Sequence, residues 1–460
     1  MARYSHRTVV PFDRDTVFGW HERPGALVRL TAPGLAKVES EPSDGLRDGS
    51  RATVKALAPL TMGTAGLRMV AEHRGFRPPE AFEDVQAKGP LRSWHHRRQF
   101  LEIAEGTAIE EQIDFEAPGP RVARAVPEAV IKRGLRRGFD YRARQLVDDL
   151  RFHAEHQTEP RRIVIAGSTG LVGTQLVALL GGGGHDVVRL VRGTPGPGEI
   201  GWDVNAGEID VEGIRDADVV IHLGGTPIAG RFTDKHKRDV LESRVKSTRL
   251  LAQTLAELAT DGKQRTFICA SATGYYGADR GDEVLTEDSA PGDDFLAEVC
   301  QQWEAACEPA RQAGLRVVNV RTGIVQSGGG GQLALQQPLF ELGLGGRLGD
   351  GQQWMPWITV DDLAGLYTHI ALTDGLSGPV NASAPEPVRN ADYTRALAGV
   401  LHRPALLPVP SIGPRLLLGD EGAREFALAG QRMSVQRALD WGYRFRHDDL
   451  RAGLSHVLAL

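Results

Sequence analysis

The chain has 460 residues, of which 41% are hydrophobic and 25% are charged, a composition typical of a globular protein with two or three domains. A net charge of −5 argues against a nucleic-acid-binding protein, and no apolar run approaches the ~20 residues of a membrane helix. There is no apolar signal segment at the start, and the three cysteines lack metal-type spacing. We therefore expect a cytoplasmic protein with reduced thiols, no metal, no nucleic acid and no membrane contact.

The first 127 residues alternate between apolar and polar side chains in short segments separated by Gly and Pro, which predicts β-strands. The clearest segments are "SRATVKALA", "LRSWHHRRQFLEI" and "GTAIEEQIDFE". A helical stripe over residues 128–153 follows them. Several strands before one long helix resemble the helix-grip fold of polyketide-cyclase and START-like proteins. This resemblance implies a domain over residues 1–155 with an apolar ligand cavity.

The polar stretch "QTEPRR" at residues 157–162 predicts a domain boundary, because the pattern changes completely after it. Apolar strands then alternate with helices, which is typical of a doubly wound parallel sheet. The strands are expected within "RRIVIAG", "DVVRLVR", "DADVVIHLGG", "RTFICASA" and "LRVVNVRTG". We expect an α/β domain of Rossmann type over residues 161–400 and a small helical module over residues 401–460.

The first of these strands runs into "AGSTGLVG" at residues 166–173, and a helix follows. Gly167 permits a tight turn, Gly170 lets the backbone approach a pyrophosphate, and Gly173 lets helix and strand pack closely. Because the pattern follows a strand and opens a helix, it predicts a dinucleotide-binding loop.

The second strand ends in Arg192, where a site for NAD usually offers an acid to the ribose 2′-hydroxyl. An arginine suits the 2′-phosphate of NADP instead, with Arg189 as an alternative candidate. We therefore expect NADP (NADPH) as the cofactor. Two further candidates for contact with the cofactor are Arg244, in the helix expected over residues 242–258, and Asp239, just before that helix.

The order of "AGSTGLVG", "HLGG", "SATGYYG" and "VRTGIV" resembles the extended short-chain dehydrogenase/reductase superfamily. The motifs "GLGGRLGDGQQWMPWITVDDLA" and "LAGQRMSVQRALDWGYRFRHDDLRAGL" are similar to its atypical, epimerase-like family that was once labelled a cell-division inhibitor. This resemblance implies a nucleotide-binding protein with a cofactor but gives no substrate. The expected cofactor contacts are Gly167, Ser168, Thr169, Gly170, Leu171, Val172, Gly173, Arg192, Leu223, Gly224, Gly225, Asp239, Arg244, Ala270 and Arg321.

The superfamily mechanism uses a serine and a Tyr-x-x-x-Lys helix, in which the lysine lowers the tyrosine pKa. Ser271 stands at the usual serine position. The tyrosine and lysine positions fall on Leu296 and Cys300, and residues 290–310 contain neither Tyr nor Lys. Tyr275 and Tyr276 are the nearest substitutes, so the expected catalytic residues are Ser271, Tyr275 and Tyr276. The alternative is that both rings only pack around the pocket.

Two features are expected to shape the substrate side. The run "QSGGGGQLAL" at residues 326–335 predicts a flexible lid, and Asp361 or Asp362 is expected to cap the helix after "PWITV". Arg321 either supplies charge to the site or anchors an acidic group of a substrate.

Three functions remain open from the sequence. The first is an NADP-dependent oxidoreductase or epimerase-like enzyme with a non-standard proton donor and an unidentified small-molecule substrate. The second is a non-catalytic NADP sensor whose N-terminal domain binds an apolar ligand. The third, regulation of cell division by protein contact, has only the family label behind it. The superfamily is also compatible with a homodimer.

Overall fold

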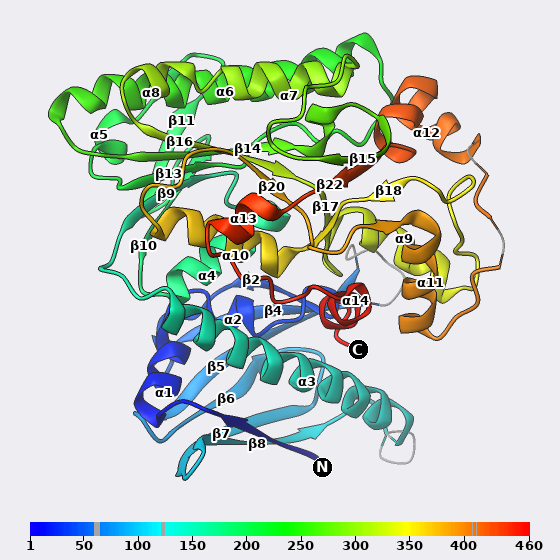
Figure 1. Cartoon of the computed structure of the whole chain (residues 1–460). Helices are drawn as coiled ribbons and strands as arrows, with labels where there is room; N and C mark the ends of the chain where they lie inside the picture. Colours follow the sequence, from blue (N-terminus) through cyan, green and yellow to red (C-terminus); the bar gives the residue numbers. More distant parts are fainter. Residues whose placement is uncertain (59–64, 121–124, 407, 411) are drawn as a thin grey trace.

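A computed structural model describes residues 1–58, 65–120, 125–406, 408–410 and 412–460. Within these ranges the chain forms an N-terminal unit with an antiparallel sheet, a parallel α/β unit and a helical C-terminal region (Figure 1). No helix of the described part is long and apolar enough to cross a membrane.

Seven strands of the N-terminal unit form an antiparallel sheet in the order β1-β8-β7-β6-β5-β4-β2. Three of the strands, β4, β7 and β8, correspond to the segments expected from alternation. The strands of this unit are β1 (Ala2–Val10), β2 (Ala36–Ser40), β3 (Ser43–Leu46), β4 (Arg51–Leu57), β5 (Gly66–Arg77), β6 (Ala81–Lys88), β7 (Ser93–Ile103) and β8 (Gly106–Glu116).

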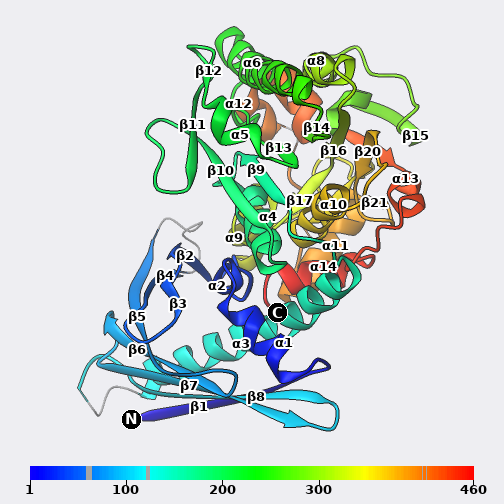
Figure 2. The ribbon, with the colours of Figure 1, turned by 90° about the vertical axis from the view of Figure 1, so that its left-hand side faces the viewer.

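The long helix α3 (Ala125–Glu155) lies between this sheet and the α/β unit (Figure 2). Phe139 packs with the core of the sheet, whereas Phe152 belongs to the core of the α/β unit. Two shorter helices, α1 (Arg14–Glu22) and α2 (Ala26–Arg29), complete the N-terminal unit. Because α3 contributes side chains to both cores, it joins the two units rather than linking them loosely.

The sheet face below α3 carries charged residues among its apolar ones. Arg98 Nη1 lies 2.7 Å from Asp84 Oδ1, and His96 Nε2 lies 3.2 Å from Glu111 Oε1. All four side chains are buried, and the ring of His96 is 5.6 Å from that of Phe139 on α3. The interior of this unit is therefore partly ionic rather than uniformly apolar.

The α/β unit is built on an eight-stranded sheet with the order β12-β11-β10-β9-β13-β14-β16-β20. All neighbours are parallel except β11 and β12. The first strands run outward from β9 on one side and then continue from β13 on the other, which is the doubly wound arrangement expected from the sequence. The strands are β9 (Arg162–Ala166), β10 (Asp186–Arg192), β11 (Glu199–Asp203), β12 (Glu208–Ile209), β13 (Val219–His222), β14 (Thr266–Ala272), β16 (Arg316–Thr322) and β20 (Gly378–Ala382).

Successive residues of the central strands enter opposite cores, because side chains of a strand alternate between its two faces. Ile163 and Ile165 pack with α4 and α10, whereas Val164 and Ala166 pack with α6 and α7. Figure 1 shows these two helical layers on either side of the sheet. The helices of the unit are α4 (Leu171–Gly182), α5 (Val211–Arg215), α6 (Asp234–Leu258), α7 (Phe295–Ala305), α8 (Glu308–Gln312) and α10 (Val360–Leu372).

Small strand pairs and helices cover the remaining side of the molecule. The pairs are β15 with β22, β17 with β19 and β18 with β21. Their bounds, with those of the helices, are β15 (Asp279–Leu285), β17 (Ile324–Gln326), β18 (Trp354–Met355), β19 (Trp357–Thr359), β21 (Val388–Arg389), β22 (Gly430–Met433), α9 (Gly331–Glu341), α11 (Asn390–Leu401), α12 (Ile412–Gly422), α13 (Gln436–Asp440) and α14 (Leu450–Val457).

The expected cap of α10 is wrong. Thr359 is the N-cap, and its Oγ1 accepts a hydrogen bond from the backbone N–H of Asp362. Asp362 also accepts from Thr359 Oγ1, whereas Asp361 forms an ion pair with Arg29 of the N-terminal unit. Both aspartates are buried, so they are occupied by tertiary contacts rather than by the helix end.

The glycine run at residues 328–331 is a packed junction rather than a loose lid. A Cβ on Gly328 would lie 2.7 Å from the carbonyl oxygen of Val457, and one on Gly329 would lie 2.8 Å from Pro33 Cβ. On its other side, a Cβ on Gly330 would lie 3.2 Å from Leu171. The glycines therefore allow the N-terminal unit, the C-terminal helix and the start of α4 to meet closely.

Candidate cofactor and active site

The turn between β9 and α4 has the geometry that its glycines predict. Gly167 has a positive φ of 83°, and a Cβ there would lie 3.0 Å from the backbone of Leu223 and Gly224. A Cβ on Gly173 would lie 2.2 Å from the carbonyl oxygen of Gly167. Gly170 caps α4 without a side-chain acceptor, so the first N–H groups of the helix remain available to an anion.

The other predicted residues of the loop differ in exposure. Ser168 is buried, Thr169 is exposed with Gly170, and Leu171 and Val172 are half-buried. The loop lies against the end of β13, where the backbone N–H of Leu223 donates to the carbonyl of Ala166. The two glycine-containing segments predicted as cofactor contacts therefore meet at the switch point of the sheet, where such folds bind ligands.

Arg192 and Asp239 lie on the surface. Arg192 is exposed at the end of β10, beside Trp202 of β11. Asp239 is exposed on α6 and forms an ion pair of 2.6 Å with Lys235 one turn earlier. That pair gives Asp239 an ordinary helix-surface role, whereas Arg192 stands at the position where a 2′-phosphate is expected.

Arg244 is a buried cation for which the described residues offer no carboxylate partner. Its Nη1 donates to the carbonyls of Thr226 and Val240 at 2.9 and 3.0 Å, and its Nε has no partner. The guanidinium lies over the ring of Trp303, and burial lowers the pKa of Arg244. Gly225 makes room for it, since a Cβ there would lie 3.0 Å from Arg244 Cζ. A buried charge of this kind suits an anionic ligand.

At the ends of β14 and β16, three polar side chains form one hydrogen-bonded group. The hydroxyl of Ser271 donates to Glu304 Oε1 at 2.7 Å. Arg321 holds the same carboxylate with Nε and Nη2, at 2.9 and 3.0 Å. Burial alone lowers the pKa of Arg321, but the hydrogen bonds and charge of Glu304 outweigh it and raise that pKa above its ordinary value.

The sheet register explains how these residues meet. Ser271 and Arg321 are paired across β14 and β16, one position after the pair of Ala270 with Val320. Glu304 reaches them from α7, which packs against β14. Glu304 is not among the site residues expected from the sequence, because its contact with Ser271 and Arg321 could not be read from the spacing. The combination of a strand-end serine, a strand-end arginine and a helical glutamate is the signal that was missed.

The two tyrosines have different surroundings. Tyr276 is fully buried, its hydroxyl donates to Asn381 Oδ1 at 2.6 Å and accepts from Arg321 Nη1, and burial raises its pKa to about 12. Tyr275 is half-buried, and the guanidinium of Arg321 lies 3.4 Å from the centre of its ring. Tyr276 therefore has the environment of a structural residue, whereas Tyr275 stacks on the cation that holds Glu304.

The tyrosine and lysine positions of the superfamily are occupied by buried Leu296 and Cys300 on α7. The Sγ of Cys300 donates to the carbonyl of Ala272 at 3.7 Å, and burial raises the pKa of this thiol to about 12. It therefore stays protonated at neutral pH and does not replace a lysine. Among the residues with described positions, no three His, Cys, Asp or Glu side chains converge as metal ligands.

Comparison with known families gives two matches along the chain. The pattern of the NAD dependent epimerase/dehydratase family matches residues 163–381. A domain of unknown function, DUF1731, matches residues 409–457 and covers the C-terminal helical region.

Two relatives are matched over all or nearly all of their own length. Epimerase family protein Mb2239 of Mycobacterium bovis is 40% identical over 298 residues, which cover 64% of this chain and 97% of that protein. The Homo sapiens epimerase family protein SDR39U1 is 34% identical over 302 residues, covering 65% of this chain and 100% of that protein.

Solved structures give the same result. The crystal structure of a nucleoside-diphosphate sugar epimerase from Corynebacterium glutamicum matches 100% of this chain and 90% of that chain, with a TM-score of 0.80 and 37% identity. Human SDR39U1 with NADPH matches 65% of this chain and 99% of that chain, with a TM-score of 0.57 and 31% identity. With its glycine loop, doubly wound sheet and C-terminal helices, this chain belongs to the epimerase family of short-chain dehydrogenase/reductase proteins.

Proposed function

We propose that the protein is an NADPH-dependent oxidoreductase with an epimerase-like site, in which Ser271 and Glu304 transfer the proton of the substrate. The observation that carries the proposal is the hydrogen-bonded group of Ser271, Glu304 and Arg321 at the carboxyl ends of two adjacent strands. Ligands of doubly wound sheets bind at that edge. The substrate is an unidentified small molecule.

The residues around the glycine loop fit a dinucleotide. The backbone of residues 167–173 and the N-terminus of α4 would hold the pyrophosphate. The glycines of this turn carry no side chain, so phosphates can approach the main chain closely. The guanidinium of Arg244, whose Nε has no hydrogen-bond partner among the described residues, would face an anionic part of the cofactor. Arg192 would hold the 2′-phosphate and favour NADPH over NADH. The NADPH in the structure of the human relative supports this preference.

When bound, NADPH would supply a hydride to the substrate, and NADP⁺ would take one from it in the reverse direction. The chain itself has to move one proton at the substrate oxygen. In the oxidation direction, Ser271 Oγ accepts that proton while its own proton passes to Glu304 Oε1, 2.7 Å away. In the reduction direction the proton runs the opposite way, from the protonated carboxyl of Glu304 through Ser271 to the substrate.

Arg321 and Tyr275 position the carboxylate of Glu304. Two N–H groups of Arg321 fix both of its oxygens, and the ring of Tyr275 covers the guanidinium. A planar, bidentate contact of this kind restrains both the place and the rotation of the carboxylate. In this proposal Ser271 and the Glu304–Arg321 pair carry out the proton transfer for which other members of the superfamily use a Tyr-x-x-x-Lys helix.

The second candidate function is a non-catalytic NADPH sensor. It is favoured by Leu296 and Cys300, which leave α7 without the proton donor that the superfamily uses. Cofactor binding would then report the redox state to another part of the molecule.

We also propose that residues 1–155 are a helix-grip domain of the START-like type. The seven-stranded antiparallel sheet with the long helix α3 across it supports this assignment. The buried ion pairs below α3 favour a ligand with polar groups over a purely apolar one.

Titration of the purified protein with NADPH and NADH, followed by cofactor fluorescence, tests the binding step. We expect NADPH to bind at least about tenfold more tightly, since a guanidinium–phosphate contact adds more than 1 kcal/mol. Equal affinity would contradict the role of Arg192, and no binding of either cofactor would contradict the whole assignment.

A panel of aldehydes, ketones, quinones and nucleoside-diphosphate sugars then tests catalysis. Oxidation of NADPH by one compound supports the enzyme, and Ser271→Ala should abolish it. Tyr276→Phe should leave turnover largely unchanged, and Tyr275→Phe should lower it only slightly because the ring remains. Tight NADPH binding without any turnover would favour the sensor.

A further inference from the structure

A groove of about 720 Å³ runs along the junction of the N-terminal unit and the C-terminal region. Its walls come from strand β1, helix α3 and helix α14, of which α3 and α14 lie beside the C-terminus in Figure 2. This volume falls in the range of ~300–1,000 Å³ that is usual for small-molecule sites. The groove lies outside the glycine loop and the Ser271–Glu304–Arg321 group.

The charged side chains along the groove are mostly basic. Arg7, Arg144 and Arg151 line it, against one acid, Asp148. Arg7 lies 3.8 Å from Glu110 with both side chains about half exposed, which is a weak pairing. Arg144 donates only to the backbone oxygen of Leu460 at 3.4 Å, and no contact of Arg151 with another described residue neutralises its charge. Basic side chains therefore outnumber acidic ones along the groove.

The floor of the groove contains a histidine pair. The rings of His447 and His456 are 4.8 Å apart, and both residues are almost completely buried. Nδ1 of His447 lies 3.2 Å from Asp362 Oδ2. Burial alone lowers the pKa of His447, but the contact with Asp362 outweighs it and raises that pKa. Nε2 of His447 contacts no acceptor in the described part of the chain, so it adds a donor to the basic walls.

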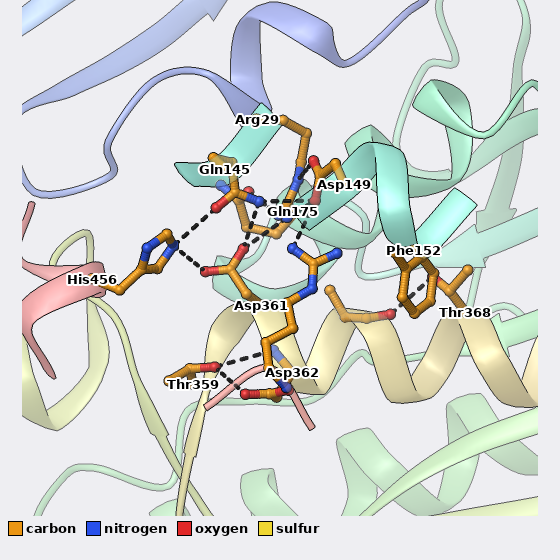
Figure 3. A network of polar contacts seen from close by, with 12 residues as sticks. Arg29, Gln145, Asp149, Phe152, Gln175, Thr359, Asp361, Asp362, Thr368 and His456 are labelled. Carbon is orange, nitrogen blue, oxygen red and sulfur yellow. Dashed lines mark hydrogen bonds and ion pairs between the residues drawn. The ribbon is translucent and has the colours of Figure 1, made fainter. Parts of the chain in front are cut away.

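The floor is connected to the helix that follows the glycine loop. His456 contacts Gln145 Oε1 at 2.9 Å, and the amide of Gln145 donates to Asp149 (Figure 3). Arg29 bridges this network: it pairs with Asp149 and donates through Nη1 to Gln175 Oε1 at 2.9 Å. Figure 3 shows these side chains converging between α2, α3, α4 and α10.

Gln175 lies on α4, only two residues after Gly173. A buried, hydrogen-bonded chain of residues therefore runs from the groove to the helix that begins at the cofactor loop, and within it Arg29 and Asp149 are completely inaccessible to solvent. Breaking one contact of this network leaves a buried charge with fewer partners, so the members of the network are energetically coupled.

We propose that this groove binds a small organic anion with an apolar body, and that the network through Arg29 and Gln175 couples its occupancy to the affinity for NADPH. The guanidinium groups and His447 would hold the acidic group. Val9, Ala143, Val147 and Ala452, which also line the groove, would contact the apolar body. The coupling rests on the proposed cofactor site, whereas binding in the groove does not.

Calorimetric titration of the full chain with three probes tests the groove. Octanoate carries both an acid and an apolar body, octanamide lacks the charge, and inorganic phosphate lacks the apolar part. We expect octanoate to bind at least about tenfold more tightly than either of the others, which corresponds to 1.4 kcal/mol. Equal binding of octanamide would overturn recognition of the anion, and equal binding of phosphate would overturn the role of the apolar wall.

Charge variants locate the site. Arg151→Gln is expected to weaken octanoate about tenfold, because a charge-assisted contact is lost. Arg415→Gln, at an exposed arginine of α12 outside the groove, is the matched control and should leave the affinity unchanged. Equal effects of the two variants would overturn the proposed location.

NADPH titration with and without saturating octanoate tests the coupling. We expect octanoate to tighten NADPH about threefold, because it orders the junction that seats α4, and NADPH to tighten octanoate by the same factor. Gln175→Leu should reduce this factor to one, whereas Gln175→Glu, which keeps an acceptor for Arg29, should retain it. Octanoate binding without any such change would overturn the coupling, and failure of NADPH to bind would contradict the cofactor site alone.

Discussion

Glu304 is the member of the Ser271–Glu304–Arg321 group that the sequence does not mark as a site residue. It shares one oxygen with the hydroxyl of Ser271 and with Nε of Arg321, and its side chain is only 14% exposed. A carboxylate in that position can accept a proton from a hydroxyl and return it. An amide of the same shape can only hold the hydrogen bonds.

Glu304→Gln is therefore expected to preserve NADPH binding within about twofold and to lower kcat about 100-fold, the usual contribution of an acid–base group. Steady-state kinetics with the best substrate of the panel measure both effects. Glu298→Gln, at an exposed position of the same helix, is the control. A normal kcat for Glu304→Gln would exclude Glu304 as the proton acceptor.

A substitution at Gly173 tests whether the turn between β9 and α4 binds the phosphates of the cofactor. A methyl group there would meet the carbonyl oxygen of Gly167 at 2.2 Å, so the turn has to open. We expect Gly173→Ala to weaken NADPH by about 100-fold, in line with the 1–3 kcal/mol of overpacking. Gly134→Ala on α3, where an added Cβ meets nothing within 4 Å, should leave the affinity unchanged. Comparable NADPH affinity in both variants would contradict a phosphate site at this turn.

The sequence predicts those site residues that follow one another closely along the chain. The spacing of Gly167, Gly170 and Gly173 and the strand-end position of Ser271 are local signals. The contact of Glu304 with Arg321 joins a helix to a strand 17 positions away, and it depends on how α7 lies on the sheet. No periodicity within either segment carries that information.

At the scale of elements, the apolar runs predict the central strands well, because each is buried on both faces and bounded by turns. Strands such as β5, with Arg68, His73 and Arg74 among its twelve residues, are poorly marked, since charged residues occupy part of each face. The cap of α10 was assigned to Asp361 or Asp362 because aspartate is common at that position. In the structure Asp361 pairs with Arg29 and Asp362 contacts His447, and Thr359 caps the helix instead.

The glycine run before α9 gives a prediction for an element junction. Gly329→Ala places a methyl group 2.8 Å from Pro33 Cβ of the N-terminal unit, so the two backbones have to separate. We expect a loss of about 2 kcal/mol in the free energy of unfolding, measured by urea denaturation. Gly413→Ala on α12, where an added Cβ meets nothing within 4 Å, is the control. Stability equal to that of the unmodified protein would show that the run is loose, as a lid would require.

For the whole molecule, the buried network of Arg29 predicts that the N-terminal and α/β units unfold together. Arg29 is completely buried and pairs with Asp149 at 2.8 Å and with Asp361 at 2.8 Å. Burial alone lowers its pKa, but the two carboxylates outweigh this and raise the pKa above its ordinary value. Of these two pairs, Arg29–Asp361 joins the N-terminal unit to the α/β unit and is kept only while the two units stay in contact.

Arg29→Met is expected to cost about 3–5 kcal/mol, because it leaves two buried carboxylates with fewer partners. Thermal unfolding by calorimetry should then change from one transition to two, as the units separate before they melt. Arg47→Met, at an exposed arginine of the same unit, should retain a single transition at the original temperature. Two transitions already present in the unmodified protein would contradict the cooperative junction.

Buried histidines in both units determine how the stability of the molecule depends on pH. Burial lowers the pKa of His21 to about 4 and those of His153 and His222 to about 3. In the unfolded chain each should titrate near about 6.5. Below that pH these histidines are protonated in the unfolded state but remain neutral in the native state. Their contribution to the free energy of unfolding is therefore fully present above about pH 6.5 and decreases as the pH falls. The raised pKa of His447 acts in the opposite direction and offsets part of this loss.

We therefore expect each of these three histidines to remove about 2 kcal/mol between pH 7.5 and pH 5, a range above the ordinary carboxyl pKa values. Urea denaturation at the two pH values measures the loss. His222→Gln keeps a neutral polar side chain next to Ser247. It should reduce the loss of unfolding free energy by about 2 kcal/mol, the contribution of one histidine, because glutamine takes up no proton. His402→Gln, at a surface histidine, should leave the pH dependence unchanged. Equal stability of the unmodified protein at both pH values would mean that the buried rings take up protons without unfolding the chain.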